Sequence, residues 1–214
     1  MMAEGEQLYR QLSDTSLLSN AETLTIYKSE DEFSRKVNKF IHSHALTQSL
    51  RDDPRFEESR PHLQIPAEMK VHSLTSGTLA GSNKIVVPPY VWIEAGGKSL
   101  VSIFYLGSDV AGHPGIVHGG LLATLLDEGL ARCCFPALPN KIGLTASLNI
   151  DYRRPAMAEA YFVLRATTVR VEGRKAWVEG RIETLPEAGE EPRVLVEAKA
   201  LFVEPKNAAV RTPV

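Results

Sequence analysis

The pattern of apolar and polar positions changes along the chain, and each change predicts a different kind of element. Between Phe33 and Ala45 the apolar residues recur every three or four positions, which predicts an amphipathic helix over residues 30–50. A short helix over residues 7–18 is also expected. Residues 52–66 are rich in charge and contain three prolines. This composition predicts a linker that leads into the main domain.

From residue 73 the apolar and polar positions alternate with a period close to two residues, which indicates strands. The expected strands cover residues 74–80, 91–95, 99–106, 143–152, 160–171, 175–184 and 193–203. The turn Gly96-Gly97-Lys98 joins the second and third of them as a hairpin. One long apolar helix, which begins near Gly119, interrupts the series. Strands on both sides of a single helix predict an α+β fold in which an antiparallel sheet wraps around that helix.

The interrupting helix has two unlike faces when its residues are placed at ~100° intervals. The bulky face, which fits the surface of a sheet, carries Leu121, Leu122, Leu125, Leu126 and Leu130. The small-residue face, which allows close approach of a ligand or a second chain, carries Gly120, Ala123, Thr124, Asp127 and Ala131. A carboxylate on such a face is costly to bury unless it is paired or used. Asp127 is therefore a candidate for chemistry.

The start of this helix is a candidate oxyanion site. Its first N–H groups have no intrahelical partner, and the helix dipole places partial positive charge there. Gly119 and Gly120 carry no Cβ that would block an approaching carbonyl. Asp127 lies seven residues beyond Gly120, roughly 10 Å along the helix. If both groups act on one carbonyl they come from two chains, which predicts a homodimer or a dimer of dimers with composite sites.

Composition and charge narrow the class of protein. The 214 residues are 43% apolar with a net charge of −2, which is typical of a globular domain and suggests no nucleic-acid partner. No apolar run reaches the ~18 residues of a membrane span. Cys133 and Cys134 are adjacent, a spacing that disfavours a mutual disulfide. We expect a reducing compartment, cytoplasmic or mitochondrial, with no metal site and no cofactor.

The motif spacing carries a resemblance to a known family. His118-Gly119-Gly120, followed by six residues and then Asp127, resembles the signature of hotdog-fold acyl-CoA thioesterases of the phenylacetyl-CoA/4-hydroxybenzoyl-CoA type. The block from Thr145 to Ala156 resembles the strand that follows the helix in that family. The resemblance implies a hotdog fold. The expected division is an N-terminal helical extension and linker (1–70), a hotdog domain (71–206) and a C-terminal tail (207–214).

The resemblance also implies catalytic roles. The N–H of Gly120, or of Gly119, donates to the developing oxyanion. Asp127 activates a water molecule or attacks as a nucleophile. His118 orients the thioester or caps the helix entrance. Thr145 matches the position of a Ser or Thr that helps to hold the attacking water, although a β-branched residue in a strand has no need of such a role.

Further residues are candidates for binding an acyl-CoA substrate. They are Gly119, His113, Asn149, Arg153 and Arg154. Adjacent arginines at a strand end point to opposite faces, so at most one of them faces a given groove. Glu128 is a rival to Asp127 as the active carboxylate. The family often carries Asn or Gln six residues before the motif histidine, whereas this chain has Gly112.

Two functions from different classes follow. The first is an acyl-CoA thioesterase that hydrolyses its substrate to a free acid and CoA. The alternative is a non-catalytic hotdog protein that binds acyl-CoA or a protein partner, which the departure at Gly112 favours and the presence of Asp127 opposes. An enoyl-CoA hydratase needs Asp and His only a few residues apart. His118 and Asp127 are nine residues apart and in the reverse order, which argues against this third hypothesis.

Overall fold

The computed structural model describes residues 18–187, 189–206 and 208. The helix expected over residues 7–18 and the tail expected over 207–214 fall, apart from residues 18 and 208, outside these ranges. The helices are α2 (Asn20–Ile26), α3 (Glu32–Ser43), α4 (Ala45–Asp52), α5 (Ala67–Lys70) and α6 (Gly119–Cys134). Within the described ranges, no helix combines the length and the apolarity needed to cross a bilayer.

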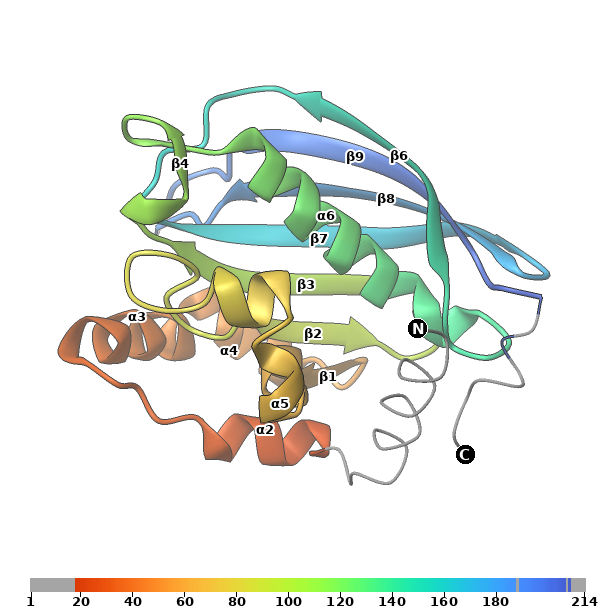
Figure 1. The fold of residues 1–214 in the computed structure, drawn as a ribbon, viewed down its shortest axis with the longest axis horizontal. Coiled ribbons are helices and arrows are strands. Elements are labelled where there is room, and N and C mark those ends of the chain that lie inside the picture. Colours follow the sequence, from red (N-terminus) through yellow and green to blue (C-terminus); the bar gives the residue numbers. More distant parts are fainter. Residues whose placement is uncertain (1–17, 188, 207, 209–214) are drawn as a thin grey trace.

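A seven-stranded antiparallel sheet wraps around α6 (Figure 1). Its strands, in chain order, are β1 (Phe56–Ser59), β2 (Tyr90–Glu94), β3 (Ser99–Leu106), β6 (Leu144–Tyr152), β7 (Ala160–Glu172), β8 (Lys175–Thr184) and β9 (Val194–Val203). The order across the sheet is β1-β2-β3-β7-β8-β9-β6. A separate hairpin, β4 (Ala111–His113) with β5 (Ile116–Val117), leads into α6. This confirms the expected α+β hotdog arrangement.

The leucine face of α6 packs onto the concave face of the sheet. Leu126 and Leu130 are fully buried there, as the helical spacing predicts. The close approach depends on a strand residue without a side chain, because an added Cβ at Gly180 on β8 would lie 2.7 Å from Leu130 Cδ1. The helix is thus pressed against the middle of the sheet, and its remaining faces point toward β6 on one side and toward the N-terminal segment on the other.

Helix α3 covers part of the outer face of the same sheet. Val37 and Ile41 pack with Trp92 of β2 and Ile103 of β3 in a second apolar cluster. The single helix expected over residues 30–50 is two helices in the structure, because the chain is extended at His44 between α3 and α4. The ring Nδ1 of His44 accepts a hydrogen bond from the Leu46 N–H (3.1 Å) and so caps α4.

Two expectations for the segment before β2 are wrong. The linker expected over residues 52–66 contains β1, which pairs with β2 and forms one edge of the sheet. The strand expected over residues 74–80 is a π-helical turn at Leu74–Thr78. Gly77 makes this turn possible, because a Cβ there would lie 1.8 Å from the carbonyl oxygen of Lys70. The turn therefore packs directly against the backbone at the end of α5.

Candidate active site

His118 organises the start of α6. It is the N-cap residue, with an extended backbone, and its ring Nδ1 accepts a hydrogen bond from the Gly120 N–H (2.9 Å). The Gly120 donor is thus engaged within the chain. Within the described residues, the Gly119 N–H has no hydrogen-bond acceptor. Of the two oxyanion donors expected from the sequence, the structure leaves Gly119 open at the positive end of the helix dipole.

The position of the His118 ring also accounts for Gly112. A Cβ at residue 112 would lie 3.0 Å from His118 Cδ2 and 3.1 Å from its Cα. A residue with a side chain at this position requires the histidine to move. The Asn or Gln that the family resemblance suggested at position 112 would therefore crowd His118, which would have to shift by a few tenths of an ångström.

Asp127 is held by the edge strand β6. Its Oδ1 accepts a hydrogen bond from the hydroxyl of Thr145 (2.8 Å). Thr145 is exposed and Asp127 is half-buried, so the carboxylate lies at the surface beside the strand. The pairing of β6 with β9 is irregular between Thr145 and Ser147, and such a bulge re-aims the side chains around it. The structure thus joins two of the candidate catalytic residues that the sequence placed 18 positions apart.

Tyr152 is a residue of this region that sequence reasoning missed. Its hydroxyl donates a hydrogen bond to the carbonyl of Gly119 (2.8 Å). A Cβ at Gly119 would lie 3.3 Å from Tyr152 Cε1, so the ring lies directly against the helix start. Alternation along β6 places Leu148, Ile150 and Tyr152 on one face, and the first two pack against the core under α6. That alternation was the available signal.

The other candidate binding residues lie away from Asp127 of the same chain. Asn149 alternates with the core-facing residues of β6, and its amide donates to Ser147 Oγ (3.2 Å) on the outer face. Arg153 pairs with Glu197 (2.7 Å). Arg154 donates to the Val194 carbonyl (2.9 Å). His113 is exposed at the end of β4, on the hairpin that leads to α6.

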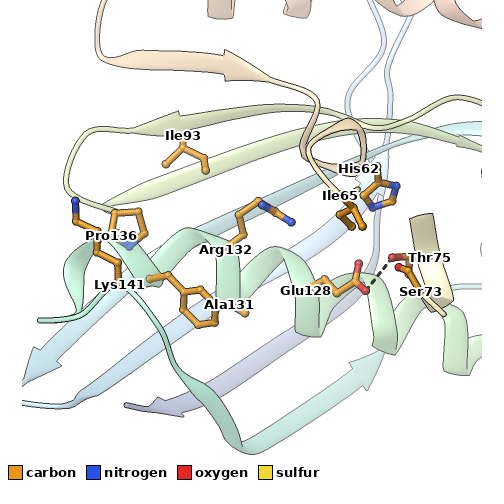
Figure 2. Close-up of a pocket in the computed structure, with 11 residues that line it drawn as sticks. His62, Ile65, Ser73, Thr75, Ile93, Glu128, Ala131, Arg132, Pro136 and Lys141 are labelled. Atoms are coloured by element: carbon orange, nitrogen blue, oxygen red, sulfur yellow. Dashed lines mark hydrogen bonds between the residues drawn. The ribbon is translucent and has the colours of Figure 1, made fainter. Parts of the chain in front are cut away.

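Glu128 lies about 100° around α6 from Asp127 and lines a cavity of about 420 Å³ under the N-terminal segment (Figure 2). Its Oε1 accepts a hydrogen bond from the hydroxyl of Thr75 (2.9 Å). Burial raises the pKa of the Glu128 carboxyl, and the Thr75 hydrogen bond opposes this only in part. The rival carboxylate therefore belongs to a different site from the Asp127–Thr145 pair.

The two cysteines at the end of α6 are buried and free. Burial raises the pKa of Cys133 to about 11 and that of Cys134 to about 12. Both thiols stay protonated near neutral pH, so neither is an activated nucleophile. The sequence-based interpretation of the pair as small apolar residues is confirmed.

The wrapped sheet, the central helix and the His-Gly-Gly cap define a hotdog-fold protein. The family model described as the thioesterase superfamily matches residues 114–189. A relative from Candida albicans (strain WO-1), described as an uncharacterized mitochondrial protein, is 32% identical over 198 residues, which cover 92% of this chain and 82% of the relative. The chain belongs to the thioesterase superfamily.

Two further likenesses concern named members of that superfamily. Mouse acyl-coenzyme A thioesterase THEM4 is 35% identical over 107 residues, which cover 50% of this chain and 44% of that protein. The chain therefore matches less than half the length of THEM4. The crystal structure of mouse thioesterase superfamily member 2 matches 50% of this chain and 75% of its own with a TM-score of 0.43 and 18% identity.

Proposed function

We propose that this protein is an acyl-CoA thioesterase that works as a homodimer without a cofactor. The observation that carries the proposal is the Asp127 carboxylate, which is held by the Thr145 hydroxyl at 2.8 Å on an exposed edge of the molecule. A carboxylate in this setting is accessible to water and oriented. The open Gly119 N–H supplies the second requirement of thioester hydrolysis, a donor for the oxyanion.

The two groups act together only across a subunit interface. Gly119 and Asp127 are eight residues apart on one helix, roughly 12 Å at 1.5 Å per residue. In the described part of the chain, β6 pairs with β9 on one side and has no strand on the other. An open edge of this kind favours pairing with a second strand. We propose that two copies of β6 pair about a two-fold axis and bring each Asp127 to the partner subunit's helix start.

In this site, Asp127 removes a proton from a water molecule that Thr145 helps to hold, and the water oxygen attacks the thioester carbonyl carbon. The carbonyl oxygen becomes negative and accepts a hydrogen bond from Gly119 N–H. The tetrahedral intermediate then collapses, the C–S bond breaks, and the CoA sulfur leaves as a thiolate that takes up the proton. In the other route, the Asp127 carboxylate attacks the thioester carbonyl carbon, the C–S bond breaks to release the CoA thiolate, and water then hydrolyses the resulting anhydride to the free acid and the Asp127 carboxylate.

The candidate substrate-binding residues differ in how free they are to contact an acyl-CoA substrate. Arg153 is already neutralised by Glu197 (2.7 Å), whereas the hydrogen bond of Arg154 goes to an uncharged backbone carbonyl. We therefore favour Arg154 as the contact for a CoA phosphate. His113, on the hairpin next to the helix start, is a proposed contact for the substrate near the thioester. Asn149 faces the outer side of the sheet, and we leave it out of the site.

Of the two compartments expected from the sequence, cytoplasmic and mitochondrial, we propose the mitochondrial one. The Candida relative that matches 92% of this chain is described as mitochondrial, and buried free thiols fit a reducing interior. Imaging of a C-terminally tagged full-length chain with a mitochondrial marker tests this placement, and an entirely cytosolic signal contradicts it.

The alternative function is a hotdog protein that binds acyl-CoA without hydrolysing it. One observation favours it, namely that the Gly120 N–H donates to His118 Nδ1 and so is withdrawn from the oxyanion site. A site with a single remaining backbone donor stabilises an oxyanion less than one with two. Turnover is the property that separates the two functions.

The test is release of free thiol from a panel of acyl-CoA esters, short, long and aromatic, by the wild type and by Asp127→Asn. Loss of the general base is expected to lower kcat by about 10²- to 10⁴-fold. Asp52→Asn is the control, because Asp52 is exposed at the end of α4, and it is expected to keep the wild-type rate. A wild type that binds acyl-CoA yet releases no thiol from any ester overturns the proposal in favour of the binding function.

A further inference from the structure

The cavity that holds Glu128 lies between the C-terminal half of α6 and the segment that precedes β2. Figure 2 shows Glu128 and Arg132 extending from α6 into this space, beneath the part of the chain that carries His62 and Ile65. With about 420 Å³, the cavity has the size of a small-molecule site. Neither Asp127 nor Thr145 lines it, and the two form a pair of their own beside β6.

Arg132 is the feature of this cavity that the fold leaves unexplained. A guanidinium offers five N–H donors. Within the described residues, none of the donors of Arg132 makes a hydrogen bond or a close ion pair. Burial lowers the pKa of Arg132, and the nearby Glu128 opposes this shift in part. A cation that is partly withdrawn from water in this way is stabilised when an acceptor is supplied.

The neighbouring ionisable groups do not supply that acceptor. Glu128, one turn earlier on α6, gives its Oε1 to the Thr75 hydroxyl instead (2.9 Å). Burial raises the pKa of Glu128. Burial also lowers the pKa of His62 to about 4, and this ring is neutral near pH 7. Lys141 adds a further positive charge to the lining. Even with Glu128 ionised, the two cations Arg132 and Lys141 outnumber the one carboxylate, so the lining has an excess of positive charge.

Apart from Ser73, the rest of the lining is apolar, with Ile65, Ile93 and Phe135 among the walls. We propose that this cavity binds a monocarboxylate with an apolar body, such as a medium-chain fatty acid, with its carboxylate on the Arg132 guanidinium and its chain against these walls. A carboxylate matches the planar guanidinium with two parallel hydrogen bonds. A dianionic phosphate would face the nearby Glu128 carboxyl with twice the charge, so a singly charged group is the better fit.

This site is distinct from the one proposed for hydrolysis, and it does not depend on turnover. Titration calorimetry of the full chain with decanoate, below its micelle concentration, is the first measurement. We expect decanoate to bind and the uncharged decanamide to bind at least about tenfold more weakly, because charge-assisted hydrogen bonds contribute an order of magnitude or more in affinity. Saturating CoA is expected to leave decanoate binding unchanged.

Arg132→Gln is expected to weaken decanoate binding at least about tenfold. Arg35→Gln is the matched control, because Arg35 is exposed on α3, and it is expected to bind decanoate like the wild type. Ala131→Leu narrows the apolar wall and keeps the charge, so it serves if Arg132→Gln does not fold, and it is also expected to weaken binding. Equal binding of decanoate and decanamide, wild-type affinity in both cavity variants, or displacement of decanoate by CoA overturns the proposal.

Discussion

Asp127 and Glu128 are neighbours on α6, and the structure gives them opposite environments. Each accepts a hydrogen bond from a threonine hydroxyl, Thr145 at 2.8 Å and Thr75 at 2.9 Å. Thr145 lies on the exposed edge strand β6, whereas Thr75 is buried in the turn before β2. Adjacent helical residues differ by ~100° in direction, and that rotation separates a solvated carboxylate from one in a cavity.

The difference between the two residues shows that the segment packed beside α6 sets how well a carboxylate on that helix is solvated. Beside the open edge of β6, Asp127 has access to water and to a second chain, as hydrolysis requires. Under the N-terminal segment, Glu128 is desolvated and the pKa of its carboxyl is raised. The N-terminal extension therefore does more than lengthen the chain, since it closes one flank of α6 and leaves the other flank open.

The largest expected effect concerns the open flank, where the Gly119 N–H is the proposed oxyanion donor. Gly119→Pro removes this N–H at the first helical position, where proline is favoured. The preceding residue, His118, already has the extended backbone that a following proline requires. Loss of one oxyanion donor is expected to lower kcat for acyl-CoA hydrolysis by about 10²- to 10³-fold.

Gly119→Ala is the matched variant, because it places a Cβ in the same contact with the Tyr152 ring (3.3 Å) and keeps the N–H. Its loss of rate is expected to be much smaller. Co-expression of Gly119→Pro and Asp127→Asn subunits adds a test of the composite site. About half of randomly mixed dimers are heterodimers with one intact site, so about a quarter of the wild-type activity is expected to return. Inactive mixed dimers contradict the shared site.

On the cavity flank the expected effect is a dependence of stability on pH. Burial, with help from the positive charges of Arg132, Lys70 and Arg60, lowers the pKa of His62 from 6.5 to about 4. Between these two pKa values, His62 is protonated in the unfolded chain and neutral in the folded one. The contribution of His62 to the free energy of unfolding is therefore greatest above about pH 6.5. It falls by on the order of 3 kcal/mol as the pH drops toward 4.

Urea unfolding of the wild type and of His62→Gln across this range measures the effect, and the variant is expected to show a flatter profile. Glu128 acts in the opposite direction, because its pKa is raised and its contribution to stability is lost as the pH rises above about 4.5. The double variant with Glu128→Gln separates the two contributions. Identical pH profiles for the wild type and His62→Gln contradict a desolvated His62.

The fold was predictable where a long segment keeps one regular spacing of apolar residues. It was not predictable where an element depends on contacts with a distant part of the chain. Sixteen residues of helical spacing predicted α6, and the strands after it followed from their alternation. The four residues of β1 include two glutamates, and only pairing with β2 makes them a strand. A period near two suggested a strand over residues 74–80, yet the shape of the turn at Leu74–Thr78 depends on the contact of Gly77 with the Lys70 carbonyl.

The candidate site divides in the same way. Spacing predicted that Asp127 and the helix start matter, and the resemblance to thioesterases pointed to Thr145, which the structure brings to the Asp127 carboxylate. The sequence does not reveal which helix N–H is free, because that depends on the rotamer of His118. Nor does it reveal that Arg132 enters a cavity, since the walls come from segments far apart in the chain.

The smallest expected effects come from the two threonines and test the comparison directly. Thr145→Val removes a hydrogen bond to a half-exposed carboxylate that water can solvate instead. It is expected to lower kcat by about 2- to 10-fold, the worth of one hydrogen bond, and to change stability by less than about 0.5 kcal/mol. Thr75→Val leaves the Glu128 carboxyl without its donor inside the cavity, and it is expected to lower the free energy of unfolding by about 1–2 kcal/mol.

Thermal unfolding of both variants measures the change in stability, and steady-state hydrolysis measures the change in kcat. Thr145→Ser keeps the hydroxyl and is expected to recover most of the rate lost in Thr145→Val, which a purely structural role of the threonine would not require. If Thr145→Val instead lowers stability as much as Thr75→Val does, then Asp127 is desolvated in the assembled protein, because its partner's surface covers it. The contrast between the flanks of α6 would then belong to the single chain and not to the dimer.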